Sequence, residues 1–285
     1  MKKPLISISI PTRNSGKTLA ISLKSLRAQT YKNIEINIVD KDSTDDTLKI
    51  AKKFKVDNIV NEPGSLLKAR HEGVRISKGD YVLIFDSDQV LERTALARCV
   101  DLINKEHYEM LIFEESVYKN NTFVEWLFNC DRILIHTVND ISPLTGTLMP
   151  RFFKRSLLNK TYSQIPKKFY VNTGGPDHDI LYYEAYKINK KVGILKNAVK
   201  HMEPSTLKEL LPKFYRWGYT SIEIASGKYD NLMIKREKFR SGLFTSGLIV
   251  ESLGSTLLLI IKGLAFYFGY YVAKIDKILN LPSRF

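Results

Sequence analysis

The feature that most constrains the fold is an alternation of short apolar runs with segments of helical periodicity across residues 1–113. The runs have the length of buried strands, and apolar residues recur at helical spacing between them. Repeated strand–helix units of this length predict an α/β fold with a mainly parallel, twisted sheet covered by helices. The expected strands are residues 5–10, 34–39, 58–60, 81–85 and 110–113, and the clearest helices are 66–76 and 92–104.

Two of the expected strands end in carboxylates. Asp40 follows the second run, while Asp86 and Asp88 end the run "YVLIFDSD". Ligands bind at the carboxyl ends of the strands in such sheets, so the two acidic clusters converge on one edge. Oxygen donors suit Mg²⁺ or Mn²⁺, which makes the D-x-D step a candidate metal site. A surface loop of solvated aspartates would give the same triplet, and the pattern alone leaves both interpretations open.

The segments "ISIPTRNSGKTLAISLKSLRAQTYKNIEINIVDKDSTDDT" and "KARHEGVRISKGDYVLIFDSDQVL" resemble the family 2 glycosyltransferases with the GT-A fold. Four features carry the resemblance in order: a P-T-x-N turn, a Q-T-Y step, an acidic residue before S-T-D-x-T, and the D-x-D. The resemblance covers roughly residues 4–200. It implies a GT-A type, Rossmann-like, mainly parallel sheet flanked by helices, and an inverting enzyme that uses a nucleotide sugar.

The resemblance also implies roles for single residues. Pro11, Thr12 and Asn14 would line the pocket for the nucleobase and ribose, and Asp40 would hydrogen-bond the base or ribose. The family often has Asp–Gly where this chain has Lys41 and Asp42, so the choice between uridine and guanosine stays open.

At the diphosphate, the resemblance implies that Asp88 is the principal ligand of Mn²⁺ or Mg²⁺ and that Asp86 lies near the ribose or metal. His201, after the last expected strand of the catalytic domain, would approach the metal or the diphosphate. Lys68 and Arg70 lie just upstream of the D-x-D and are cations that could contact a diphosphate.

A second acidic site is "GGPDHD", where Asp177 and Asp179 open an expected helix. Family members often place a catalytic base in a Glu-Asp pair here, and Pro176 replaces the Glu. A base is needed because an acceptor hydroxyl is a poor nucleophile until its proton is removed. Both aspartates could instead cap the helix or interact with its dipole, so two interpretations remain, with Asp177 the first candidate for the base.

The composition shifts after Pro204, so we expect a catalytic domain at 1–205 and a C-terminal helical, membrane-leaning extension at 206–285. Residues 253–273 are apolar and about long enough to cross a bilayer, although Lys262 falls in the middle. The aromatic residues near its end are typical of a membrane interface. A helix lying on the membrane, a buried helix or oligomer contact, and a transmembrane span all remain open.

The formal charge of +14 suits an anionic membrane surface or phosphate-rich ligands, and no sequence pattern supports nucleic acid as a partner. The two cysteines, Cys99 and Cys130, form no disulfide framework, and the N-terminus lacks a signal-like apolar stretch. We therefore expect a cytoplasmic protein, peripheral on the inner face of the cell membrane.

The sequence favours an inverting, metal-dependent hexosyltransferase that moves a sugar from a UDP- or GDP-sugar to a lipid-linked saccharide or another saccharide acceptor. A polyprenyl or dolichyl phosphate is the alternative acceptor. Two other classes stay open: a sugar-phosphate nucleotidyltransferase, and a non-catalytic protein that binds membrane or nucleic acid through its charge.

Overall fold

The computed structural model describes residues 3–137, 141–173, 175–222, 228–233 and 247–284. Within these residues eight strands form one sheet in the order β3-β2-β1-β4-β7-β6-β8-β5. Strands β7 and β5 run antiparallel to their neighbours, and the other six share one direction, which confirms the expected mainly parallel sheet. The strands are β1 (Ile6–Thr12), β2 (Ile34–Asp40), β3 (Asn58–Asn61), β4 (Tyr81–Ile84), β5 (Gln89–Leu91), β6 (Met110–Val117), β7 (Pro150–Lys154) and β8 (Val192–His201).

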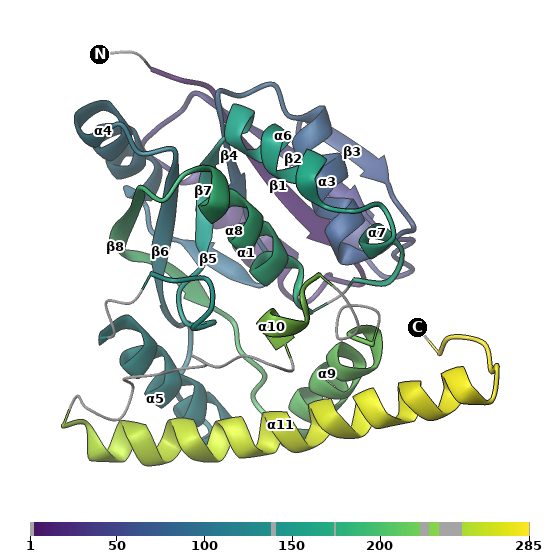
Figure 1. Ribbon diagram of the computed structural model, residues 1–285. Coiled ribbons are helices and arrows are strands. Elements are labelled where there is room, and N and C mark those ends of the chain that lie inside the picture. The colour runs from purple at the N-terminus through teal and green to yellow at the C-terminus, as the bar shows by residue number, and fades with distance from the viewer. Residues whose placement is uncertain (1–2, 138–140, 174, 223–227, 234–246, 285) are drawn as a thin grey trace.

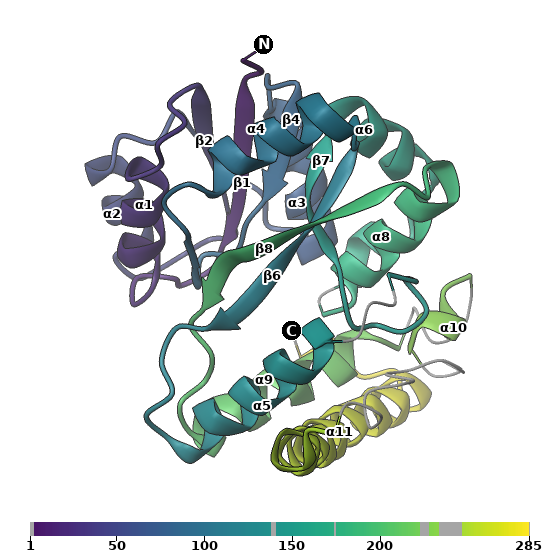
Figure 2. The same ribbon diagram turned by 90° about the vertical axis from the view of Figure 1, so that its left-hand side faces the viewer.

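Helices cover both faces of the sheet (Figures 1 and 2). Helices α1, α2 and α4 pack on one face, and α3, α6 and α8 pack on the other. Helices α5, α9 and α11 lie beyond the edge where the parallel strands end. The helices are α1 (Leu19–Arg27), α2 (Thr47–Lys53), α3 (Leu66–Ile76), α4 (Ala95–Glu106), α5 (Phe123–Thr137), α6 (Arg155–Gln164), α7 (Phe169–Asn172), α8 (Asp177–Ile188), α9 (Leu207–Thr220), α10 (Asp230–Met233) and α11 (Ile249–Ile278).

The central strands are apolar throughout because both of their faces are buried. Along the run after Tyr81, alternate side chains enter different cores: Leu83 and Phe85 join the core under α1 and α4, while Val82 and Ile84 join the core under α3 and α8. The alternation follows from the period of two in a strand. It holds the following carboxylates, Asp86 and Asp88, at a fixed place at the sheet edge.

A third core joins α5, α9 and α11. The backbones of α9 and α11 approach closely at two glycines. A Cβ added at Gly218 would lie 1.8 Å from the Phe266 carbonyl oxygen, and one at Gly269 would lie 2.0 Å from the Tyr215 carbonyl oxygen. Since any side chain at these positions would collide with backbone, α11 is fixed tightly against α9.

Strand β6 contains an irregularity that α5 compensates. Its register with β8 shifts between Phe113 and Glu115, and the Glu115 backbone N–H donates instead to His136 Nε2 of α5 at 2.9 Å. Burial lowers the pKa of His136 to about 4, although nearby Glu115 opposes the shift. The ring therefore stays neutral and accepts the hydrogen bond.

This arrangement predicts a pH-dependent stability. Because the pKa of His136 is lower in the folded chain than its ordinary value of 6.5, the unfolded chain binds protons first. The contribution of His136 to the free energy of unfolding is therefore complete above about pH 6.5. It falls by roughly 3 kcal/mol as the pH falls to about 4. We expect His136→Gln to flatten the fall in melting temperature across this range. The exposed His107→Asn is the control, and a wild-type slope in both variants would contradict the assignment.

Candidate active site

A cleft of about 940 Å³ lies at the edge where the parallel strands end. The end of β1 contributes Thr12, the loop after β4 contributes Asp88, and the end of β8 contributes His201. The opposite wall comes from the C-terminal helices, with Lys213 of α9 and Lys262 of α11. The volume is typical of a ligand pocket, and its place at the strand ends is where α/β sheets bind ligands.

Asp86, Asp88 and His201 come together at the floor of this cleft. Their potential ligand atoms all lie within 4.8 Å of one another, and His201 Nε2 is 3.4 Å from Asp88 Oδ1. Strand β5 produces this proximity because Gln89 pairs with His201 across the β5–β8 ladder. Two carboxylates with one imidazole form a donor set that fits Mn²⁺, and carboxylates alone suit Mg²⁺. The residues present therefore fit the divalent cation expected from the sequence.

His201 is itself held by acidic neighbours. Its Nδ1 lies 3.3 Å from Glu203 Oε1. Burial alone would lower the pKa of His201, but Asp88 and Glu203 outweigh it and raise that pKa. Arg132 of α5 donates to the same Glu203 at 2.5 Å. Burial would raise the pKa of Glu203, but His201 and then Arg132 hold it well below its usual range.

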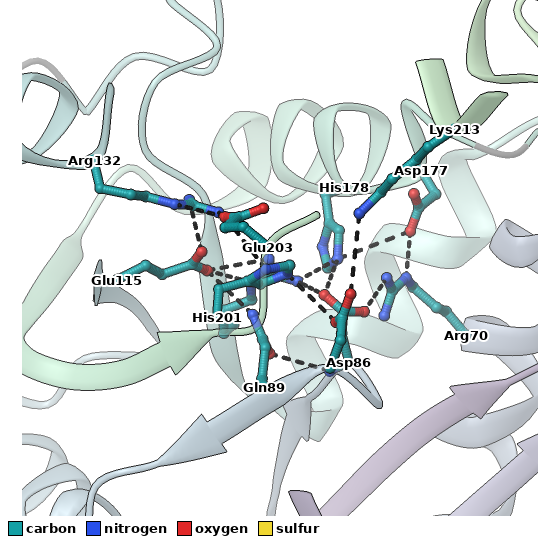
Figure 3. A network of polar contacts seen from close by, with 12 residues as sticks. Arg70, Asp86, Gln89, Glu115, Arg132, Asp177, His178, His201, Glu203 and Lys213 are labelled. Carbon is teal, nitrogen blue, oxygen red and sulfur yellow. Dashed lines mark hydrogen bonds and ion pairs between the residues drawn. The ribbon is translucent and has the colours of Figure 1, made fainter. Parts of the chain in front are cut away.

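A buried chain of alternating acidic and basic side chains continues from Glu203 and Arg132 (Figure 3). Arg132 pairs with Glu115 at 2.7 Å, and Glu115 pairs with Arg151 at 3.1 Å. Arg151 and Arg70 hold the two oxygens of Asp86 at 2.8 Å and 2.7 Å. Burial favours the neutral acids, but the arginines hold the pKa of Asp86 well below its usual range and lower that of Glu115 to about 2. Both carboxylates are therefore ionised at neutral pH.

Asp177 ends this chain at the start of α8. Its side chain is 2% exposed, and Arg70 Nε donates to its Oδ2. The neighbouring His178 accepts from Arg151 through Nε2, so its proton is on Nδ1. Burial and the two arginines lower the pKa of His178. Arg70 thus ties the candidate base to Asp86, a residue of the candidate metal site.

The turns after β1 and β2 are locked together. Asp40 is buried and accepts hydrogen bonds from the Thr12 hydroxyl at 2.6 Å and from the Ser43 backbone N–H at 2.8 Å. Asn14, in the left-handed region with φ of 50°, accepts from the Thr44 N–H at 2.9 Å. In this arrangement the Asp40 carboxylate shapes the turn, and the neighbouring Thr12 and Asn14 line the cleft.

The structure brings most of the predicted site residues to one cleft. Asp40, Lys68 and Asp179 are not among the described residues that line it. Lys68 Nζ lies 2.9 Å from Glu62, and Asp179 is in the first turn of α8. The predicted roles of these three residues stay predictions. The predicted residues that do line the cleft are Pro11, Thr12, Asn14, Arg70, Asp86, Asp88, Asp177 and His201.

Sequence reasoning missed the charged residues that support the site. For Glu115 and Arg151 the available signal was a charge beside strongly apolar strand residues, in "LIFEES" and "MPRFFK", and for Glu203 it was an acid two residues after His201 in "HMEP". Such a charge is buried when its strand is central, and a buried charge requires a partner. Arg132 and Lys213 lie on helices α5 and α9 and carried no such signal. The missed residues are Glu115, Arg132, Arg151, Glu203 and Lys213.

The fold and this site define a GT-A type protein, and a family model agrees. The model described as glycosyl transferase family 2 matches residues 7–165. This stretch is more than half of the chain and contains β1 through β7, including the D-x-D. The chain therefore belongs to glycosyl transferase family 2.

Among curated proteins, the chain is similar to the Escherichia coli protein WfaP, a UDP-Glc:α-D-GlcNAc-diphosphoundecaprenol β-1,3-glucosyltransferase. The two are 36% identical over 106 residues, which is 36% of this chain and 42% of WfaP. The first curated relatives are each matched over less than half of their own length.

Two solved structures show the same fold over nearly the whole chain. The mannosyltransferase PcManGT from Pyrobaculum calidifontis, in complex with GDP-Man and Mn²⁺, has a TM-score of 0.57 at 17% identity and covers 98% of this chain and 88% of that one. Staphylococcus aureus TarS 1–349, in complex with UDP-GlcNAc, has a TM-score of 0.55 at 17% identity, with 98% and 93% covered. At this identity the likeness establishes the fold.

The alternating charges predict that Arg70 stabilises the fold. We expect Arg70→Met to lower the free energy of unfolding by about 3 kcal/mol, because it leaves the carboxylates of Asp86 and Asp177 without a shared partner. Urea denaturation at pH 7 measures this loss. The control is Arg75→Met on the same helix, whose side chain is 66% exposed and pairs only locally with Glu72. Equal stability of the two variants would refute the role given to Arg70.

Proposed function

We propose that this protein is an inverting, metal-dependent glycosyltransferase that takes its sugar from a UDP- or GDP-sugar. The observation that carries the proposal is the cluster of Asp86, Asp88 and His201 inside the cleft at the strand ends. Family membership supports the reaction class. The nucleotide-sugar complexes of TarS and PcManGT support the donor class.

The residues of this chain divide the chemistry between two ends of the cleft. Asp88, Asp86 and His201 would hold a Mn²⁺ or Mg²⁺ ion, with His201 binding as the neutral imidazole. When bound, such an ion neutralises charge on the departing nucleoside diphosphate. Lys213, whose Nζ lies 4.0 Å from Asp88 Oδ2, adds a positive charge on the same side. These groups favour the transition state because charge develops on the leaving group.

The acceptor side carries Asp177, which serves as the base for a hydroxyl acceptor. Arg70 donates to its Oδ2, and the side chain lines the cleft. One base opposite one leaving-group site suits a single in-line displacement, which inverts the anomeric carbon. A phosphate acceptor, such as a polyprenyl phosphate, is already anionic and requires no base. The two acceptor types therefore differ in their dependence on Asp177.

The same proposal places α11 on the cytoplasmic face of a membrane. It is the described helix that is long and apolar enough, by length and composition, to cross a bilayer, and 17% of its most apolar window is buried. Its buried residues recur from Gly254 to Asp276, so it packs on α5 and α9 along most of its length. This packing favours a helix that lies in the headgroup region. The residues exposed on its outer side are Ile249, Val250, Leu253, Leu257, Ile260, Leu264, Tyr267, Phe268, Tyr271, Ile275 and Ile278.

The lysines and aromatic residues of α11 support an anionic lipid surface as the partner of the outer side of this helix. Tyr267, Phe268 and Tyr271 are exposed toward the end of α11, followed by exposed Lys274 and Lys277. Aromatic rings and lysines beside an apolar stripe suit the headgroup level of an anionic leaflet. The acceptor of WfaP is a lipid diphosphate, which supports a lipid-linked saccharide as the acceptor here. The division into a catalytic domain at 1–205 and an extension at 206–285 belongs to this proposal.

Calorimetry with UDP and GDP, each with and without Mn²⁺, tests the donor site. We expect one nucleotide to bind in a Mn²⁺-dependent manner and Asp88→Ala to weaken that binding at least tenfold, since it removes a charged ligand of the metal. Donor hydrolysis and transfer should be lost together. Asp177→Asn is the matched control, because it removes a carboxylate charge from the same cleft while nucleotide binding should remain.

Turnover then separates the acceptors. Loss of transfer in Asp177→Asn, with nucleotide binding retained, supports a hydroxyl acceptor activated by Asp177. Intact turnover in this variant, alongside loss in Asp88→Ala, rules that acceptor out and favours a phosphate. Nucleotide binding that is unchanged both without Mn²⁺ and in Asp88→Ala would overturn the proposed metal site.

Attachment to the membrane is tested on the outer side of α11. Leu264 and Phe268 are 69% and 66% exposed. We expect the double variant Leu264→Glu, Phe268→Glu to bind anionic vesicles at least about tenfold more weakly, because two apolar side chains no longer enter the lipid. Cosedimentation with vesicles measures this. Ile188→Glu, an exposed apolar residue on α8, is the control. Dissociation of an oligomer in place of lost vesicle binding would show that α11 is a protein contact.

A further inference from the structure

Helix α11 has one charged side chain between residues 252 and 273, and that side chain is Lys262. A lysine at this position would be costly if it faced the hydrocarbon of a bilayer. The structure instead turns it to the inner side of the helix, where it lines the cleft. The helix therefore presents an apolar face outward and a cation inward.

Aromatic rings fix the position of this cation. Lys262 Nζ lies 4.8 Å from the centre of the Phe214 ring of α9 and 5.3 Å from the centre of the Phe128 ring of α5. Both phenylalanines line the same cleft. The faces of aromatic rings attract a cation, so these contacts hold the ammonium group in place. Its ammonium group is thus held at the junction of α5, α9 and α11.

A continuous row of side chains connects this junction to the candidate metal site. Lys213 Nζ lies 4.0 Å from Asp88 Oδ2 and 5.4 Å from the centre of the Trp217 ring. The Trp217 ring is in turn 4.8 Å from the Phe214 ring, which contacts Lys262. An acceptor that enters from the α11 side passes Lys262 before it reaches the donor.

We propose that Lys262 binds the phosphate that joins the acceptor sugar to a lipid. The inference rests on the proposed function and specifies its acceptor. With the outer side of α11 in the headgroup region, the tail of a lipid-linked saccharide stays in the membrane, its phosphate lies at the level of the helix, and its sugar reaches into the cleft. An ammonium group with three donors matches phosphate oxygens without demanding one geometry.

Two other cations of the cleft, Arg13 and Lys41, lie on the side of the proposed nucleotide site. Arg13 belongs to the P-T-x-N turn, and Lys41 follows Asp40 at the end of β2. Both lie beside the locked turns, whereas Lys262 comes from the helix with the exposed apolar face. Its place in the fold distinguishes an acceptor phosphate from the donor diphosphate.

The test uses the full chain with Mn²⁺ and the preferred nucleotide bound, and follows tryptophan fluorescence because Trp217 lies beside the proposed path. The probes are GlcNAc-diphosphoundecaprenol in phosphatidylcholine vesicles, soluble GlcNAc-1-phosphate, and phosphatidylcholine vesicles alone. We expect Lys262→Met to weaken binding of the first two probes about tenfold. Lys262→Arg should restore it, and Lys274→Met on the exposed side should bind like the wild type.

The remaining outcomes overturn the inference in distinguishable ways. If Lys262→Met weakened binding to vesicles without the acceptor by the same factor, Lys262 would be a contact for membrane headgroups and not for the acceptor. Unchanged binding in Lys262→Met, or no binding of either phosphate probe by the wild type, would remove its role with the acceptor while the donor site stands. Loss of Mn²⁺-dependent nucleotide binding by the wild-type chain would instead remove the proposed function itself.

Discussion

The carboxylate of Asp86 is held between the guanidinium groups of Arg70 and Arg151, and the rest of the site is arranged around this pairing. A buried charge is stable only when its partners are in place, so each ion pair fixes the element that carries it. The pairs join α3, β7, β6, α5 and α8 at the edge where the strands end. The packing of the sheet and the geometry of the site therefore depend on each other.

This dependence also sets the electrostatics of the cleft. Four carboxylates alternate with three guanidinium groups from Glu203 to Asp177, which leaves an acidic excess before Asp88 is counted. The region next to His201 is thus locally negative, although the chain as a whole is strongly basic. Such a pocket attracts a divalent cation, and the lysines of α9 and α11 surround it with positive charge for anionic ligands.

Much of the site could be predicted because convergence at strand ends is a property of parallel sheets. This argument predicts the place of Asp86 and Asp88, the family resemblance adds His201, and the structure brings the three together. The arginines were not identifiable, since β7 inserts between β4 and β6 out of chain order and brings Arg151 to Asp86 across 65 residues. Strand β5 was missed because three residues carry too little periodicity, although it places Asp88 beside His201.

The glycine contacts between α9 and α11 couple the position of α11 to the shape of the cleft. With Gly218 and Gly269 packed backbone to backbone, α11 cannot change its tilt or depth without carrying α9 along. Helix α9 bears Lys213 and Trp217, which line the cleft, so a shift of α11 would change the width of the cleft. With α11 attached to a membrane as proposed above, bilayer thickness and curvature would change the width of the cleft. A chain shortened before residue 247 would lose the part of the cleft wall that α11 supplies.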